Sequence, residues 1–391
     1  MLDELTLPDH FRAFADVVER DGGTAYPAIC RGVADDPEIL SLLDIAPVPQ
    51  RRPLLLLAAV HFLLLSGAQH ELTAYYDTVA NLRGLAYDPP GSDITPVFTD
   101  FCRARRAELE ALIGTRRTQT NEVGRCTALL PGLCHVASLY GWVEPLSLLD
   151  LGTSAGLNLL FDDYAYVYRA EDGGAAVQAG DPSSAVMLEC SSRLGLEHLP
   201  ELRLPVMAER VGLDLSPLDP CSDEEALWLL ACQWPDNPVR FARLRAALDN
   251  VRAVADTPRL ERGDMVTDVP RIAASIRDPG PLVVFHSWVA AYLDEDEQRT
   301  LATTVRALGR DRPVHYLYCE SPFETSGLPT PPPPVPRDGP DHATALVHIG
   351  PGAEAVRLAD MHPHGYWIRW WPTRPGPTAR RVEQAPLSPP R

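Results

Sequence analysis

The apolar residues follow a helical spacing in the first third of the chain and gather into short runs after it. Up to about residue 145, four stretches have the period of helices and are separated by prolines: HFRAFADVVER, DPEILSLLDIA, PLLLLAAVHFLLL and FCRARRAELEALI. From there on, seven apolar runs predict strands, at 146–152, 209–215, 258–264, 281–287, 313–320, 344–350 and 366–371. Five stretches between them predict helices, at 156–161, 223–231, 237–255, 267–277 and 294–309. Such alternation is typical of right-handed βαβ units and a mostly parallel sheet.

This pattern predicts a helical N-terminal cap domain over 1–145 and an α/β domain over 146–371. An insertion at 162–206, which contains several tyrosines and glycines, follows the first predicted helix of the α/β domain, and we expect it to shape a pocket. The proline-rich segment 328–340 is predicted to be an exposed loop, and residues 372–391 a disordered tail. The link between the last two strand candidates is short and polar, which allows an antiparallel strand at one edge.

Composition and charge narrow the classes of partner. Of the 391 residues, 45% are hydrophobic and 23% are charged, as in soluble folded proteins. The net charge of −18 disfavours nucleic acid and anionic membranes as partners, so we expect a small-molecule substrate. The apolar run 53–65 is shorter than the roughly 20 residues that span a bilayer and is predicted to be a buried helix.

The cysteines and histidines point to neither a disulfide framework nor a metal centre. Eight scattered cysteines form no CxxC pair, which suits a reducing cytosol. The first residues, MLDELTLPDHFRAF, lack the basic start and apolar core of a signal peptide, so we expect a cytoplasmic protein. His362 and His364 form an H-x-H pair without a third ligand in view, and we predict a loop there and no metal site.

The segment LSLLDLGTSAGLNLLFDDY, at 146–164, carries the strongest chemical signal. An apolar strand ends in Asp150 and turns through Gly152, Ser154 and Gly156 into an apolar helix. Small residues let a ligand approach the backbone, and the amides of a helix N-terminus offer donors at the carboxyl edge of the sheet. We therefore predict a ligand-binding turn.

Three functions are possible for this turn, beside the alternative that it is a tight turn that binds no ligand. The first is the acid-x-Gly-x-Gly-x-Gly pattern of S-adenosylmethionine-dependent methyltransferases, with Ser154 in place of the middle glycine; Asp214 and Asp264 follow at the ends of the next two predicted strands. The second is a G-x-S-x-G nucleophile elbow, in which Ser154 would act with Asp264 and His286. The third is a dinucleotide turn, which the glycine spacing and the distant next acid disfavour.

The region 146–371 resembles the class I S-adenosylmethionine-dependent methyltransferase fold, a Rossmann-like αβα sandwich of seven strands with the last antiparallel. Together with AAVHFLLLSGAQHEL, NEVGRCTALLPGL, QWPDNPVRFARLRAAL and VVFHSWVAAYL, the chain is similar to a bacterial family known only as a domain of unknown function. The resemblance implies the fold and an S-adenosylmethionine pocket at Asp150, Gly152, Ser154, Gly156, Asp214 and Asp264. The chain departs from many methyltransferases at Ser154, in the long insertion, and where Phe285-His286-Ser287 ends the fourth strand.

Other side chains are candidates by their position. His286, at the predicted carboxyl end of the fourth strand, is the candidate catalytic base, although a hydrogen-bonded strand-end histidine explains it equally well. Glu122 and Arg125 either face the cofactor's amino-acid end or pair with each other at i and i+3. The substrate candidates are His61, His70, Tyr76, Asn158, Asp162, Tyr164 and Trp288. A core role for His61 and a capping role for Asn158 are the simpler explanations.

The sequence thus predicts an S-adenosylmethionine-dependent methyltransferase that acts on a small-molecule acceptor. Two alternatives stay open: a non-catalytic or regulatory protein that keeps the fold, and a serine hydrolase that uses Ser154.

Overall fold

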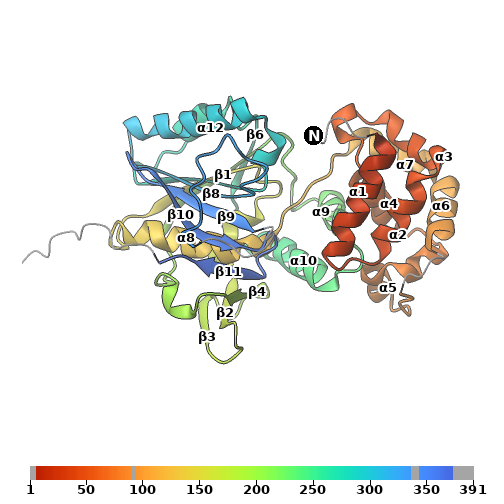
Figure 1. Ribbon diagram of the computed structural model, residues 1–391, viewed down its shortest axis with the longest axis horizontal. Helices are drawn as coiled ribbons and strands as arrows, with labels where there is room; N and C mark the ends of the chain where they lie inside the picture. The colour runs from red at the N-terminus through yellow and green to blue at the C-terminus, as the bar shows by residue number, and fades with distance from the viewer. Residues whose placement is uncertain (1–5, 90–93, 336–342, 373–391) are drawn as a thin grey trace, which may run out of the picture.

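The computed structural model describes residues 6–89, 94–335 and 343–372, and Figure 1 shows a helical part beside a sheet flanked by helices. The helical part contains α1 (Leu7–Arg20), α2 (Ala25–Ala34), α3 (Pro37–Leu40), α4 (Pro53–Leu65), α5 (Asp77–Arg83), α6 (Ile94–Ala104) and α7 (Arg106–Thr115). Helix α4 is apolar on every side and is buried at the centre of the helical part, as the run 53–65 predicted. No helix within the described ranges is long and apolar enough to cross a membrane.

The described strands form one mixed sheet. They are β1 (Leu146–Leu151), β2 (Ala165–Ala170), β3 (Ala176–Gly180), β4 (Met187–Ser192), β5 (Met207–Asp214), β6 (Arg259–Arg262), β7 (Leu282–Ser287), β8 (Val314–Glu320), β9 (Thr344–Ile349), β10 (Ala355–Met361) and β11 (Trp367–Trp370). Their order is β3-β2-β4-β11-β10-β9-β8-β7-β1-β5-β6. The five strands from β8 to β6 are parallel, whereas β9, β10 and β11 are each antiparallel to the preceding strand.

The order of the parallel strands sets where a ligand would bind. By chain order, the row β6-β5-β1-β7-β8 is third, second, first, fourth and fifth, so the direction of winding reverses between β1 and β7. In open α/β sheets the crevice beyond the carboxyl ends of the strands at such a switch point is the usual ligand site. Here the β1 residue Leu151 pairs with His286 of β7 at that end.

The predicted α/β class is confirmed, but the sheet has eleven described strands instead of seven. The extra strands come from two places. The insertion 162–206 forms β2, β3 and β4, which join the sheet beside β11, at the opposite end from β6. Strand β10 lies between the last two predicted strands; its middle holds a buried ion pair, Arg357 with Asp360, that hides the apolar pattern of a strand.

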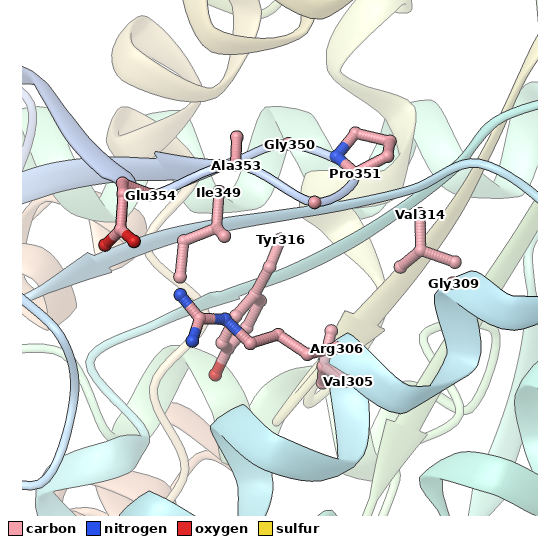
Figure 2. A pocket seen from close by; sticks show the side chains of 11 residues that line it. Val305, Arg306, Gly309, Val314, Tyr316, Ile349, Gly350, Pro351, Ala353 and Glu354 are labelled. Atoms are coloured by element: carbon pink, nitrogen blue, oxygen red, sulfur yellow. The ribbon is translucent and has the colours of Figure 1, made fainter.

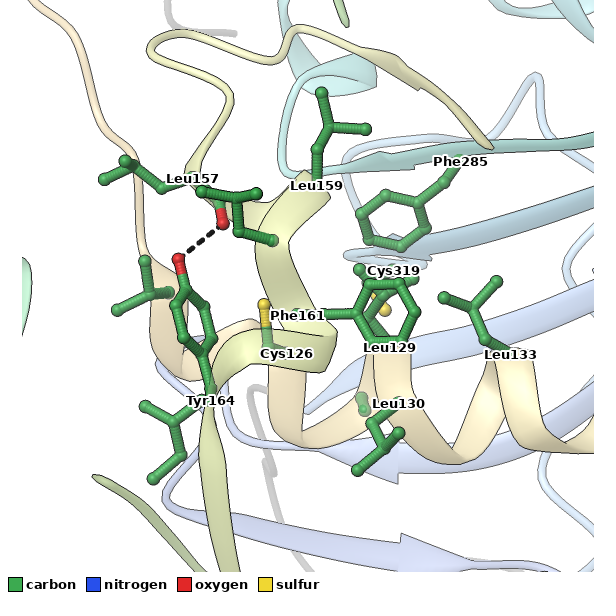
Figure 3. Close-up of a cluster of buried hydrophobic side chains, with 14 of the residues drawn as sticks. Cys126, Leu129, Leu130, Leu133, Leu157, Leu159, Phe161, Tyr164, Phe285 and Cys319 are labelled. Atoms are coloured by element: carbon green, nitrogen blue, oxygen red, sulfur yellow. Dashed lines mark hydrogen bonds between the residues drawn. The ribbon is translucent and has the colours of Figure 1, made fainter. Parts of the chain in front are cut away.

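Helices cover both faces of the sheet. On one face α8 (Cys126–Ser138) and α10 (Pro238–Ala253) pack on residues of β1, β7 and β8. Figure 3 shows part of this core, where Leu129 and Leu133 of α8 lie beside Phe161, Phe285 and Cys319. On the other face lie α11 (Val269–Ala274) and α12 (Glu295–Ala307).

Where the two parts meet, two helices pack against the part to which the sequence did not assign them. Helix α8 belongs by sequence to the predicted cap, yet it packs on the sheet. Helix α9 (Asp223–Ala231) lies within the predicted α/β domain, yet Trp228 and Ala231 join the core of the helical part next to α4. The expected tail lies outside the described residues from 373 onward, as does the part of the proline-rich loop at 336–340.

Candidate functional site

The turn that follows β1 is tied to β5 through its backbone. The N–H groups of Gly152 and Thr153 both donate to the carbonyl of Leu213, at 2.8 and 3.3 Å. Gly152, Ser154 and Gly156 all have left-handed backbones, with φ of 71°, 55° and 74°. For Ser154, which has a Cβ, this conformation is strained by about 1 kcal/mol or more. The Ser154 hydroxyl is buried and has no hydrogen-bond partner among the described residues. Strain and an unsatisfied hydroxyl at one residue mark this turn as a functional candidate.

Two of the three predicted strand-end acids converge on the turn. Asp214 Oδ2 accepts the N–H of Ser154 at 2.9 Å, and its Oδ1 accepts the N–H of Ser216 at 2.8 Å. Asp150 is 3% exposed, and its Oδ2 accepts the hydroxyl of Thr153 at 2.9 Å. Burial raises the pKa of Asp150 to about 7; the Thr153 hydrogen bond opposes the shift and the charge of Asp214 adds to it.

The third acid, Asp264, binds backbone groups of the loop in which it lies. Asp264 Oδ1 accepts the N–H groups of Val266 and Thr267 at 2.7 and 3.2 Å, which stabilises the turn after β6. Its other oxygen makes no hydrogen bond within the described residues. The structure therefore brings Asp150 and Asp214 to the glycine turn and leaves Asp264 at the end of the neighbouring strand.

The segment after β7 forms the opposite wall. An ideal Cβ on Gly152 would lie only 2.5 Å from Val289 Cγ2, so the side chain of Val289 already packs on this glycine. Trp288 has a φ of 54°, the second strained residue just beyond a carboxyl end, and its indole N–H donates to Thr344 Oγ1 at 2.9 Å. Strained residues thus follow both strands at the switch point.

His286 is enclosed in a chain of buried side chains. Its Nδ1 lies 2.7 Å from Glu320 Oε1 and its Nε2 lies 2.7 Å from the hydroxyl of Tyr316. A neutral imidazole satisfies both contacts by donating from Nδ1 and accepting at Nε2. The backbone N–H groups of Val289 and Ala290 also donate to Glu320 Oε1, whereas Oε2 is buried and finds no partner in the part of the chain that the structure describes. His286 is 0% exposed and Glu320 is 1% exposed, so His286 contacts other groups only through its two hydrogen-bonded neighbours, Glu320 and Tyr316.

Glu122 and Arg125 do not pair with each other. Glu122 is 4% exposed and binds Arg240 at 2.8 Å and Arg243 at 2.6 Å. Burial raises the pKa of Glu122, but Arg240, His364 and Arg243 together outweigh it and hold this pKa well below its usual range. Arg125 donates instead to the carbonyls of Pro363 and Ser287, at 3.0 and 3.1 Å.

The helical part holds three of the predicted substrate residues away from the turn. His61 is buried, contacts the carbonyls of Ala231 and Gln233 through Nδ1 at 3.1 and 3.2 Å, and has its pKa lowered by burial to about 4. Tyr76 packs on His61, with ring centroids 5.4 Å apart. His70 accepts the N–H of Leu72 and lies 3.3 Å from Asp100. None of the three contacts the turn at 152–156.

The remaining candidates lie in or beside the core under the turn. The hydroxyl of Tyr164 donates to the carbonyl of Leu157 at 2.6 Å, and Figure 3 shows its ring among apolar side chains. Asn158 accepts a weak contact from the Cys126 thiol, and Asp162 pairs with Arg210 at 2.5 Å. His362 and His364 lie in the turn between β10 and β11; no set of three or more His, Cys, Asp or Glu side chains within the described ranges is arranged to hold a metal ion.

Two cavities lie near the sheet without including the turn's glycines, one beside Ala155 and one beside the amino end of β8. One, of about 340 Å³, lies beside Ala155 and is lined mainly by apolar residues of the loops around 217–221 and 257–260. The other, of about 320 Å³, lies between the end of α12 and the turn after β9; Figure 2 shows Arg306, Tyr316 and Glu354 around it. Because the Tyr316 hydroxyl contacts His286, the hydrogen-bonded chain to Glu320 starts at the wall of this second cavity.

Arg240 and Arg243 are the site residues that the sequence prediction missed. They lie at i and i+3 in the first turns of α10, where the helix dipole disfavours cations. Basic residues near a helix N-terminus indicate that a carboxylate pairs with them. This indication was present in the sequence. It did not indicate that the partner would be Glu122, 118 and 121 residues away.

A comparison with known families finds a match over nearly the whole chain. A family model described as "Uncharacterized protein conserved in bacteria (DUF2332)" matches residues 8–370. The chain belongs to the DUF2332 family. The match runs from α1 to β11, so in this DUF2332 protein it covers both the helical part and the sheet. No curated protein matches the sequence.

Proposed function

We propose that this DUF2332 protein binds S-adenosylmethionine at the carboxyl edge of β1 and β5 and methylates a small-molecule acceptor. The observation that carries the proposal is the contact between Asp214 and the backbone of Ser154, which joins the acid after the second parallel strand to the turn after the first. The strand order β6-β5-β1-β7-β8, followed by antiparallel β9, supports a Rossmann-type site at this switch point.

The residues at the edge suit the polar groups of this cofactor. Each oxygen of Asp214 accepts a single N–H and keeps a lone pair for a ribose hydroxyl. The unpartnered hydroxyl of Ser154 and the free oxygen of Asp264 add further hydrogen-bonding capacity along the same edge. Val289 packs on Gly152, so the ligand would lie toward Ser154 and Asp214. Asp150 fixes the turn from beneath through Thr153.

When bound, the cofactor supplies a sulfonium methyl group, which passes to an acceptor nucleophile while the sulfur becomes a neutral thioether. For such an in-line displacement the protein has to align the two reactants and accept the acceptor's proton where one is released. Glu320 and His286 form the candidate proton-accepting pair. Glu320 Oε2 has no hydrogen-bond partner among residues 6–89, 94–335 and 343–372, and His286 positions the carboxylate through Oε1.

Serine hydrolysis has one observation in its favour, the left-handed φ of 55° at Ser154, because a nucleophile elbow is also a strained strand-to-helix turn. A hydrolase needs a base within hydrogen-bond reach of the hydroxyl. No described residue hydrogen-bonds Ser154 Oγ, and both nitrogens of His286 are engaged by Glu320 and Tyr316. Methyl transfer is the better supported of the two.

Two measurements on one preparation distinguish methyl transfer from serine hydrolysis. The thermal midpoint of the full chain is measured with S-adenosylmethionine, S-adenosylhomocysteine and NAD, and the same preparation is treated with a fluorophosphonate probe. We expect stabilisation by the two adenosyl compounds, none by NAD, and no labelling. Labelling that Ser154→Ala abolishes, without stabilisation by either adenosyl compound, would replace methyl transfer with hydrolysis.

A further inference from the structure

Two guanidinium groups bind a single buried carboxylate where the helical part meets the edge of the sheet, and a third lies near it without contacting it. Arg125 is 7% exposed and Arg240 is 6% exposed, and the side chain of Arg243 is 9% exposed. Arg240 and Arg243 both bind Glu122, which also accepts the N–H of Gly124 at 2.9 Å. Arg125, three residues from Glu122, forms no ion pair with any carboxylate among the described residues.

The positive charge of this cluster exceeds the negative charge that contacts it. Three guanidiniums stay charged at neutral pH, and Glu122 balances one of them. Glu320 acts on Arg125 only at longer range, and burial keeps Asp150 partly protonated near pH 7. His364, 3.5 Å from Glu122, has its pKa lowered by burial and adds no compensating charge. A buried charge without a partner is costly, so the cluster favours an incoming anion.

The cluster also has hydrogen-bond donors to offer. Arg243 Nε is buried and makes no hydrogen bond to any residue within the described ranges. Arg125 uses Nε and Nη1 for the carbonyls of Pro363 and Ser287, which leaves Nη2 without a partner among the described residues. Trp288 and Tyr366 lie 5.9 and 6.0 Å from the guanidinium carbons of Arg125 and Arg243 and frame the same region.

We propose that Arg125 and Arg243 form a subsite for an anionic group, a carboxylate or a phosphate, on the acceptor molecule. Guanidiniums recognise both groups through paired N–H donors, and three guanidiniums with one carboxylate leave two positive charges for a monoanion or dianion to balance. Arg125 also contacts Ser287 at the end of β7, so the subsite adjoins the edge where the cofactor is proposed to bind. Only the assignment of the anion to the acceptor rests on the proposed function.

The subsite is tested with inorganic phosphate and with acetate, each titrated into the full chain at constant ionic strength made up with chloride. The readout is the thermal midpoint together with the heat of binding. We expect saturable binding that weakens about tenfold or more in Arg125→Gln and Arg243→Gln, because each loses a charged hydrogen bond. Arg299→Gln, which removes an exposed arginine of α12 paired with Glu295 and Asp296, is the matched control and should bind as the parent does.

Each other outcome overturns a defined part of the inference. No saturable response to either anion in the parent protein overturns the subsite, even if both glutamine variants fail to fold. Binding that persists unchanged in Arg125→Gln or in Arg243→Gln places the anion elsewhere. Competition between phosphate and S-adenosylhomocysteine assigns the anion to the cofactor's carboxylate and overturns the assignment to the acceptor. Failure of S-adenosylhomocysteine to bind leaves the phosphate result interpretable by itself.

Discussion

The carboxylate of Asp214 accepts the backbone N–H of Ser154 across 60 residues of sequence, at 2.9 Å. The same carboxylate holds the N–H of Ser216, so one side chain fixes both the turn after β1 and the loop after β5. Asp214→Ala leaves both N–H groups without an acceptor and should cost about 1–3 kcal/mol in the free energy of unfolding. Asp214→Asn keeps one acceptor oxygen and should cost less.

Hydrogen exchange at the Ser154 amide is the specific readout for this contact. We expect faster exchange in Asp214→Ala than in the parent protein, with Asp249→Ala, an exposed aspartate of α10, as the control. Unchanged protection of the Ser154 amide in Asp214→Ala would show that the carboxylate does not fix the turn.

Gly152 is required for its conformation and for the space around it. In Gly152→Ala the new methyl overlaps Val289 and the backbone keeps a φ of 71°, so the variant should lose about 2–4 kcal/mol of stability. Gly84→Ala is the matched control. The φ of Gly84 is 64° and no described residue lies within 4 Å of an added Cβ, so this variant should lose only the backbone contribution of about 1 kcal/mol. In urea unfolding, Val289→Ala should partly rescue Gly152→Ala in a double-mutant cycle. Strict additivity would argue against the contact.

Asp150 should make stability fall as pH rises. Its pKa is raised from 3.8 to about 7 by burial, so between about pH 4 and pH 7 the unfolded chain loses a proton that the folded chain keeps. Stability contributed by the protonated group is therefore complete below pH 4 and is lost progressively up to pH 7. Asp150→Asn stays neutral and can still accept the Thr153 hydroxyl. The difference in the free energy of unfolding between Asp150→Asn and the parent should therefore shift in favour of the variant by on the order of a few kcal/mol from pH 4 to pH 8. A pH-independent difference would contradict the raised pKa.

Glu122 should be far more important to stability than a surface glutamate. Glu122→Gln leaves Arg240 and Arg243 buried without a countercharge and should cost about 3–5 kcal/mol in chemical denaturation. The control is Glu110→Gln, which breaks the half-exposed pair of Glu110 with Arg106 and should cost less than about 1 kcal/mol. Similar losses for the two variants would mean that the arginine cluster is already neutralised by another group.

The sequence predicted the parts of the fold whose pattern is local. The strands β1, β5, β7 and β8 were predictable because each is an apolar run that ends near a polar residue or glycine. The helices α10 and α12 were predictable because polar residues flank them. Strand β3 was not, because its residues are exposed or half-buried and lack alternation. The insertion's pairing with β11 depends on contacts across more than 170 residues, which no local pattern encodes.

The site was predictable to the same extent. Asp150, Asp214 and the glycine turn follow strand ends, so chain order alone placed them at one edge. The burial of His286 between Glu320 and Tyr316 depends on the register of β7 against β8, in which His286 pairs with Tyr318. The pairing of Glu122 with Arg240 and Arg243 depends on how α10 packs against the segment before α8. Both are tertiary features.

Calorimetric titration with S-adenosylhomocysteine tests the central claim most directly. It is carried out on the full chain, on Asp214→Ala and Asp150→Ala variants shown to be folded, and on the exposed-site control Asp249→Ala. We predict one micromolar site per chain, lost or strongly weakened in the first two variants and unchanged in the control. Absence of binding by the folded parent protein, or binding that survives in Asp214→Ala, would contradict a cofactor site at the carboxyl edge of β1 and β5.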